Sequence, residues 1–205
     1  LRFIAMDLLS ESPRLALLAK KWGQFLPVWV PFALWTRMIS KSSASCSLSE
    51  LLNYWLKNYN EERLYPLIEQ ALYDERLLLL VDGLDEWTNE NAATVALDRL
   101  QVFIKQRNSP AIITSRPSGF RRLGGKQDEW QIGELSDFSL DQQRSLSNIW
   151  FAHRIKAHDE TCERDEIERL ANIETDRVIS ELNRSKDLKD LAMVPLLLCL
   201  LIYHK

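Results

Sequence analysis

The feature that most constrains the fold of this chain is an unbroken apolar run that ends on acidic residues. Residues 77–81 are Leu-Leu-Leu-Leu-Val, and Asp82 follows them directly. A run of this length without polar alternation is typical of a strand buried on both faces, as in a parallel α/β sheet. Because ligands of such sheets bind beyond the carboxyl ends of the strands, the acids after residue 81 lie where a ligand would bind.

Three carboxylates follow this strand, at Asp82, Asp85 and Glu86. A single carboxylate at a strand end can hold a hydrated Mg²⁺ ion beside phosphates, and a later one can orient or deprotonate a water. Gly83 removes a side chain where the backbone must approach a ligand. The alternative is that the acids only favour the start of the next helix through its dipole. That alternative accounts for Asp85 and Glu86, but not for a buried strand that ends on Asp82.

Strands and helices alternate from residue 26 to about residue 150, which predicts βαβ units and a parallel sheet. The strands are expected at residues 26–33, 77–81, 111–114 and 130–135. The first of them contains Pro27 and Pro31, which do not belong in a central ladder. Ser47 and Glu50 have the spacing of a capping box that begins a helix. A glycine-rich loop is expected at residues 118–128.

The strand patterns stop after about residue 140, and the rest of the chain is predicted to be helical. Ser139 and Gln142 form a second capping box. Pro195 is expected to divide the last apolar segment into two helices, because proline suits a first helical turn but not an interior. We therefore predict an α/β domain at residues 1–137 and a small all-α domain at residues 138–205.

The net charge of −3 over 205 residues gives no support for a nucleic-acid-binding surface, and no direct nucleic-acid binding is predicted. The compact basic run of Arg121, Arg122 and Lys126 is interpreted as part of a solvated loop.

The three cysteines lack metal-ligand or redox spacing, which favours a reducing compartment and a cytoplasmic location. They are Cys46, Cys162 and Cys199. The longest apolar run, residues 191–203, is too short to span a bilayer, so no membrane partner is expected.

Arg116 directly follows the predicted strand at residues 111–114, so it is expected at the same sheet edge as Asp82. A guanidinium at that edge can sense a γ-phosphate and stabilise charge in a transition state. The alternative is an ion pair with a neighbouring acid. Taken alone, Pro195 is better explained as helix punctuation than as a ligand contact.

These segments together resemble a known family. The segment Leu77–Glu86 resembles the Walker B segment of the NACHT branch of STAND P-loop NTPases, in which a small residue follows the first Asp and further acids follow three and four positions on. Residues 113–117, Ile-Thr-Ser-Arg-Pro, resemble the sensor 1 segment of that family. Residues 191–197, Leu-Ala-Met-Val-Pro-Leu-Leu, resemble its helical-domain segment.

The resemblance implies a P-loop NTPase-like parallel sheet flanked by helices, followed by a small all-α domain, with ATP or ADP and Mg²⁺ as ligands. It implies that Asp82 binds Mg²⁺, that Asp85 or Glu86 handles the attacking water, that Arg116 reads the γ-phosphate and that Pro195 contacts adenine. The implied function is a nucleotide-dependent signalling switch that self-associates on activation, with effector and sensor domains elsewhere, in innate immune or antiviral defence. The alternatives are a turnover ATPase of the AAA type and a degenerate, non-catalytic interaction scaffold.

One element of the family pattern is missing from the sequence. No Gly-x-x-x-x-Gly-Lys-Ser/Thr occurs in the 205 residues. The family pattern places this loop and the central first strand immediately before Leu1, so we expect the chain to be a fragment that begins after them.

Residues 1–205 alone are therefore expected to bind ATP weakly or not at all, because the loop that cradles the phosphates is absent from them. Isothermal titration with Mg²⁺ and ATP measures this. Tight, magnesium-dependent binding by residues 1–205 would contradict the expectation.

Overall fold

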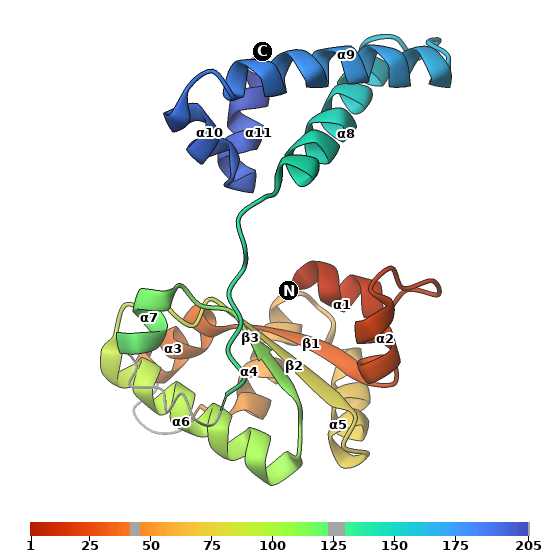
Figure 1. Cartoon of the computed structure of the whole chain (residues 1–205). Coiled ribbons are helices and arrows are strands. Elements are labelled where there is room, and N and C mark those ends of the chain that lie inside the picture. Colours follow the sequence, from red (N-terminus) through yellow and green to blue (C-terminus); the bar gives the residue numbers. More distant parts are fainter. Residues whose placement is uncertain (42–45, 123–129, 205) are drawn as a thin grey trace. The chain divides into compact units, whose positions relative to one another are not determined.

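The computed structural model describes residues 1–41, 46–122 and 130–204, which form two compact units (Figure 1). The first unit, Leu1–Trp130, contains a three-stranded parallel sheet in the order β1-β2-β3. The strands are β1 (Leu26–Pro31), β2 (Leu77–Asp82) and β3 (Ala111–Ile113). The predicted parallel sheet is therefore confirmed, and its central strand is the acid-tipped one.

Helices flank this sheet and connect its strands (Figure 1). They are α1 (Arg2–Leu8), α2 (Ala16–Trp22), α3 (Phe32–Lys41), α4 (Leu48–Asn58), the short 3₁₀ helix η1 (Glu62–Leu64), α5 (Tyr65–Tyr73), α6 (Glu90–Arg107) and α7 (Pro117–Arg122). Both parallel pairs thus have helical crossover connections, as parallel strands require.

The unbroken apolar run of β2 is explained by helices on both faces of the sheet. Successive side chains of a strand point to opposite faces. Leu78 and Leu80 pack in one cluster with residues of α1 and α2, whereas Leu77, Leu79 and Val81 pack in another with residues of α3 to α6. All five side chains are completely buried. A polar residue at any of these positions would face a core, which is why the run shows no alternation.

The two prolines of β1 are compatible with its place at the edge of the sheet, where a missing N–H group costs no ladder hydrogen bond on the open side. The predicted capping box at the start of α4 is confirmed. Ser47 Oγ accepts from the Glu50 N–H at 3.2 Å, and the Ser47 N–H donates to Glu50 Oε2 at 2.6 Å. The donation from the Ser47 N–H lowers the pKa of the Glu50 carboxyl.

Three local predictions were wrong. The first strand ends at Pro31 rather than at residue 33, because α3 begins at Phe32, which is completely buried. Residues 130–135 form no strand: Gly133 interrupts the apolar pattern, and Leu135 is fully exposed instead of packed on a core. The glycine-rich segment begins as helix α7 rather than as a loop, and residues 123–129, with Lys126, lie outside the described residues.

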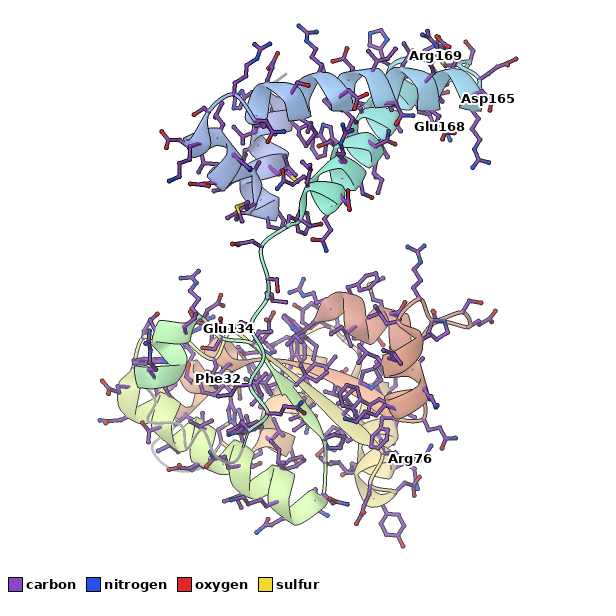
Figure 2. The ribbon with its side chains drawn as sticks, viewed as in Figure 1. Phe32, Arg76, Glu134, Asp165, Glu168 and Arg169 are labelled. Carbon is purple, nitrogen blue, oxygen red and sulfur yellow. The ribbon has the colours of Figure 1, made fainter. Side chains whose placement is uncertain are left out.

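The second unit, Gln131–Lys205, is helical throughout its regular structure. It consists of α8 (Leu140–His158), α9 (Arg164–Leu182), α10 (Lys186–Ala192) and α11 (Pro195–Tyr203). The helices enclose a small apolar core that includes Phe151 and Leu198. Charged side chains such as Asp165 and Arg169 lie on the exposed surface of α9 (Figure 2).

Both helix boundaries predicted from capping and proline in this unit are confirmed. Ser139 and Gln142 form the capping box at the start of α8. Pro195 lies at the first turn of α11, directly after the break that ends α10. Over the described ranges, no helix is both long and apolar enough to cross a membrane.

Truncating a buried side chain of β2 tests how much the burial of this strand stabilises the first unit. Leu79→Ala should lower the free energy of unfolding by about 3 kcal/mol, since it removes buried methyl groups and leaves a cavity between the sheet and its helices. Urea denaturation measures the change. Leu17→Ala is the control, because Leu17 is 85% exposed and its truncation should be close to neutral. Equal effects of the two substitutions would contradict the central place of β2.

Candidate functional site

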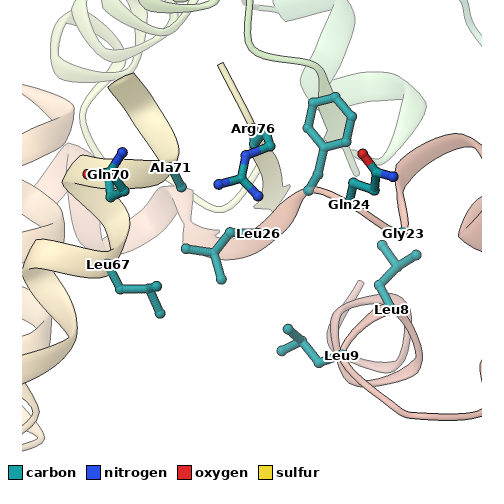
Figure 3. A pocket seen from close by; sticks show the side chains of 10 residues that line it. Leu8, Leu9, Gly23, Gln24, Leu26, Leu67, Gln70, Ala71 and Arg76 are labelled. Carbon is teal, nitrogen blue, oxygen red and sulfur yellow. The ribbon is translucent and has the colours of Figure 1, made fainter. Parts of the chain in front are cut away.

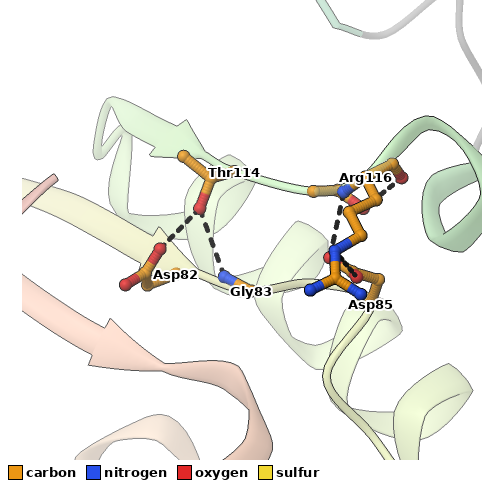
Figure 4. A network of polar contacts seen from close by, with 6 residues as sticks. Asp82, Gly83, Asp85, Thr114 and Arg116 are labelled. Atoms are coloured by element: carbon orange, nitrogen blue, oxygen red, sulfur yellow. Dashed lines mark hydrogen bonds and ion pairs between the residues drawn. The ribbon is translucent and has the colours of Figure 1, made fainter. Parts of the chain in front are cut away.

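Asp82 ends β2 at the carboxyl edge of the sheet, and both of its oxygens accept hydrogen bonds. Its Oδ1 accepts from the Thr114 hydroxyl at 2.6 Å (Figure 4). Its Oδ2 accepts from Trp29 Nε1 at 3.2 Å. Thr114 directly follows β3 and Trp29 lies in β1, so the donors come from the two strands that flank β2. Asp82 as a whole is half-buried.

The turn after the strand depends on Gly83. Its φ of +69° lies in the left-handed region that favours glycine. A Cβ at this position would also lie 2.8 Å from the Cδ and Oε2 atoms of Glu86. The Glu86 carboxylate therefore folds back over the residue next to Asp82. This chain path brings a second carboxylate to the strand end.

Thr114 closes the same turn against β3. Its hydroxyl accepts from the Gly83 N–H at 3.2 Å (Figure 4). Its carbonyl accepts from the Leu84 N–H at 2.8 Å. Its own N–H donates to the Val81 carbonyl at 3.0 Å. The segment after β3 is thus fixed directly to the acidic turn after β2.

Asp85 holds the segment that carries Arg116. The Arg116 N–H donates to Asp85 Oδ1 at 3.0 Å, and Arg116 Nε lies 3.6 Å from Asp85 Oδ2 (Figure 4). The Asp85 side chain is only 12% exposed, whereas the Arg116 side chain is 81% exposed. The structure therefore contains the ion pair that sequence reasoning offered as an alternative, while the guanidinium still faces solvent.

Helix α7 packs against this turn through a glycine that the sequence analysis did not single out. A Cβ on Gly119 would lie 1.9 Å from Asp85 Cβ and 2.8 Å from its Cα. No side chain fits in that space, so Gly119 allows the helix after Arg116 to contact the acidic turn. Pro117 was the signal in the sequence, because proline is common at the first position of a helix. A loop was instead predicted from residue 118.

Four of the predicted site residues therefore lie at one edge of one sheet: Asp82, Asp85, Glu86 and Arg116. Sequence reasoning missed Trp29 and Thr114, whose donor groups contact Asp82. Pro195 belongs to the second unit, so its contact with adenine stays a prediction.

The residues at this edge suit a Mg²⁺ ion that is shared with phosphates. Within the described part of the chain, no three His, Cys, Asp or Glu side chains are grouped as a protein-only metal site. Mg²⁺ commonly keeps several waters and takes one or two carboxylates together with substrate phosphates. Asp82, a half-buried residue at the carboxyl end of a strand, fits that pattern.

A cavity of about 330 Å³ lies at the opposite, amino edge of the sheet (Figure 3). Leu26, the first residue of β1, and Arg76, just before β2, contribute to its lining. It contains none of the predicted site residues. Ligands of parallel sheets bind at the carboxyl edge, so this cavity is not our candidate for the nucleotide site.

The first unit is a parallel sheet flanked by helices. Its central strand ends on an acid, and an arginine follows the neighbouring strand β3. These features together define a P-loop NTPase-like α/β protein. The particular family follows from a comparison with protein families, in which the NACHT domain matches residues 13–154. The match covers more than half of the chain and includes the whole acidic turn and Arg116. The chain therefore belongs to the NACHT family of nucleotide-binding NTPase domains. No curated protein and no solved structure matched.

The close packing of α7 on the acidic turn is testable with two glycines. Gly119→Ala should destabilise the first unit by about 1–3 kcal/mol, because the added methyl group overlaps Asp85 and the helix must shift. Gly133→Ala is the matched control, since a Cβ there meets no atom within 4 Å. Thermal unfolding measures both. A neutral Gly119→Ala would show that α7 does not pack on Asp85.

Proposed function

We propose that this NACHT domain is a nucleotide-dependent switch whose Mg²⁺ and γ-phosphate contacts lie at the carboxyl edge of the sheet. The observation that carries the proposal is the placement of Asp82 at the end of β2 and of Arg116 in the segment after the neighbouring β3, linked through the turn at residues 83–86. A cation ligand and a phosphate ligand at one edge suit a Mg²⁺–polyphosphate, because that group presents both charges together.

The geometry supports different roles for the two later acids. Asp85 accepts the Arg116 N–H and pairs with its guanidinium, so we assign it to holding the sensor segment. Glu86 is exposed and its carboxylate lies over Gly83, so we assign Glu86 to orienting or deprotonating the attacking water. Bound Mg²⁺ would supply charge stabilisation, and Asp82 would hold it.

Arg116 is suited to respond to the γ-phosphate because its present partner holds it weakly. The guanidinium is 81% exposed and lies 3.6 Å from Asp85 Oδ2, so water screens its side of the pair and a phosphate can replace Asp85 as its partner at little cost. The N–H donation to Asp85 keeps the backbone of Arg116 in place during such an exchange. In this proposal the Arg116 side chain changes its partner, while the segment after β3 stays bound to Asp85.

Membership of the NACHT family supports a proposal for the wider function. We propose that ATP or ADP occupancy controls how the α/β domain at residues 1–137 packs with the helical domain at residues 138–205, where Pro195 contacts adenine. Release of that packing permits self-association and passes the signal to effector domains, in a cytoplasmic defence pathway.

Removing the proposed Mg²⁺ ligand tests the switch in the intact protein. Asp82→Ala should weaken the Mg²⁺-dependent response to ATP at least about tenfold, because loss of a group that only orients a metal ligand already costs about that much and Asp82 would be the ligand itself. Hydrolysis and nucleotide-dependent assembly are measured together, by phosphate release and light scattering. Asp98→Ala, at an exposed position of α6, is the control.

The same measurements separate the alternatives. Slow hydrolysis coupled to assembly supports the switch, whereas rapid turnover stimulated by a polymer substrate would indicate an AAA-type motor. A wild-type protein without any response to nucleotide would indicate an interaction scaffold. An Asp82→Ala variant that hydrolyses and assembles normally would contradict the assignment of Asp82.

A further inference from the structure

The environment of Asp82 contains two donors whose purpose is not explained by the fold alone. Trp29 and Thr114 each donate one hydrogen bond to it, and each uses a different carboxylate oxygen. The two donors approach from strands on opposite sides of β2. A carboxylate held at both oxygens from both sides cannot rotate freely about its side-chain bonds.

Each donor is itself held in place. The Arg2 guanidinium carbon lies 4.0 Å from the centroid of the Trp29 ring, and the Trp55 ring lies at 5.2 Å. These contacts limit rotation of the indole and keep its N–H directed at Asp82. Trp29 thereby connects the strand end to residues of both α1 and α4.

The direction of the Thr114 hydroxyl follows from its two contacts. Its oxygen accepts from the Gly83 N–H at 3.2 Å, so the hydroxyl hydrogen remains available for donation (Figure 4). Asp82 Oδ1, at 2.6 Å, is the acceptor. The distance is short, as is usual for hydrogen bonds from a hydroxyl to an ionised carboxylate.

We propose that Trp29 and Thr114 are positioning residues that orient the Asp82 carboxylate for Mg²⁺. The proposal rests on the proposed function, in which Asp82 binds that ion. Groups that orient a metal ligand raise the affinity for the metal without touching it, because the ligand loses less freedom on binding. Neither residue contacts the ion in this account, and each acts through Asp82.

The test measures metal binding rather than turnover. Mn²⁺ is titrated into the intact protein in the presence of ADP, and the electron paramagnetic resonance signal of free Mn²⁺ gives the dissociation constant. Thr114→Val and Trp29→Phe should each raise this constant about tenfold, since each deletes one donor and keeps most of the side-chain volume.

Two matched variants separate orientation from packing. Thr114→Ser keeps the hydroxyl and should bind Mn²⁺ within about twofold of the wild type. Trp22→Phe makes the same change at the end of α2, in the cluster that contains Leu78 and Leu80, and it should also remain within about twofold. If Trp29→Phe does not fold, as judged by circular dichroism, the comparison of Thr114→Val with Thr114→Ser decides the question.

The outcomes distinguish this inference from the function on which it rests. Normal Mn²⁺ binding by Thr114→Val and Trp29→Phe, with weak binding by Asp82→Ala, would overturn the positioning role and leave the Mg²⁺ site intact. Normal binding by Asp82→Ala would overturn both. Equal losses in Thr114→Val and Thr114→Ser would indicate a packing role and would also overturn the inference.

Discussion

The hydrogen-bonded pairing of β2 with a parallel strand on each side is the constraint on which the site depends. In the register of the sheet, Pro31 pairs with Asp82 and Val81 pairs with Ile113, so all three strands end at the same edge. That alignment places the donor groups of Trp29 and Thr114 against one carboxylate. A shift of either neighbouring strand by one residue would turn its side chains to the other face of the sheet. The chemistry of Asp82 is therefore a consequence of sheet register.

The segments beyond this edge are held by close contacts that require glycine. Gly83 adopts a positive φ and leaves room for the Glu86 carboxylate, while Gly119 lets α7 approach Asp85. Gly83 lies between Asp82 and the Glu86 carboxylate, and Gly119 lies against Asp85 three residues after Arg116. The turn at residues 83–86 and helix α7 are thus packed closely on one another. The Arg116 side chain, in contrast, remains exposed and able to change its partner.

Much of this arrangement could be predicted from the sequence, because the strongest signals come from burial. The unbroken run at residues 77–81 predicted the central strand, and the acids after it predicted the functional edge. The capping residues Ser47 and Ser139 fixed two helix starts. Trp29 and Thr114 could not be identified in this way, because their role depends on which strands are neighbours, and local patterns do not contain that information. The exposed segment at residues 130–135 has strand-like composition but no core to cover.

The most direct test of this account is the position of a metal ion in the intact protein. A crystal grown with Mn²⁺ and a non-hydrolysable ATP analogue would show the ion by its anomalous scattering. The account predicts a peak beside the Asp82 carboxylate, bound to it directly or through one water, with the Arg116 guanidinium turned from Asp85 to the terminal phosphate. A nucleotide-bound Mn²⁺ ion at a place remote from Asp82 would contradict it.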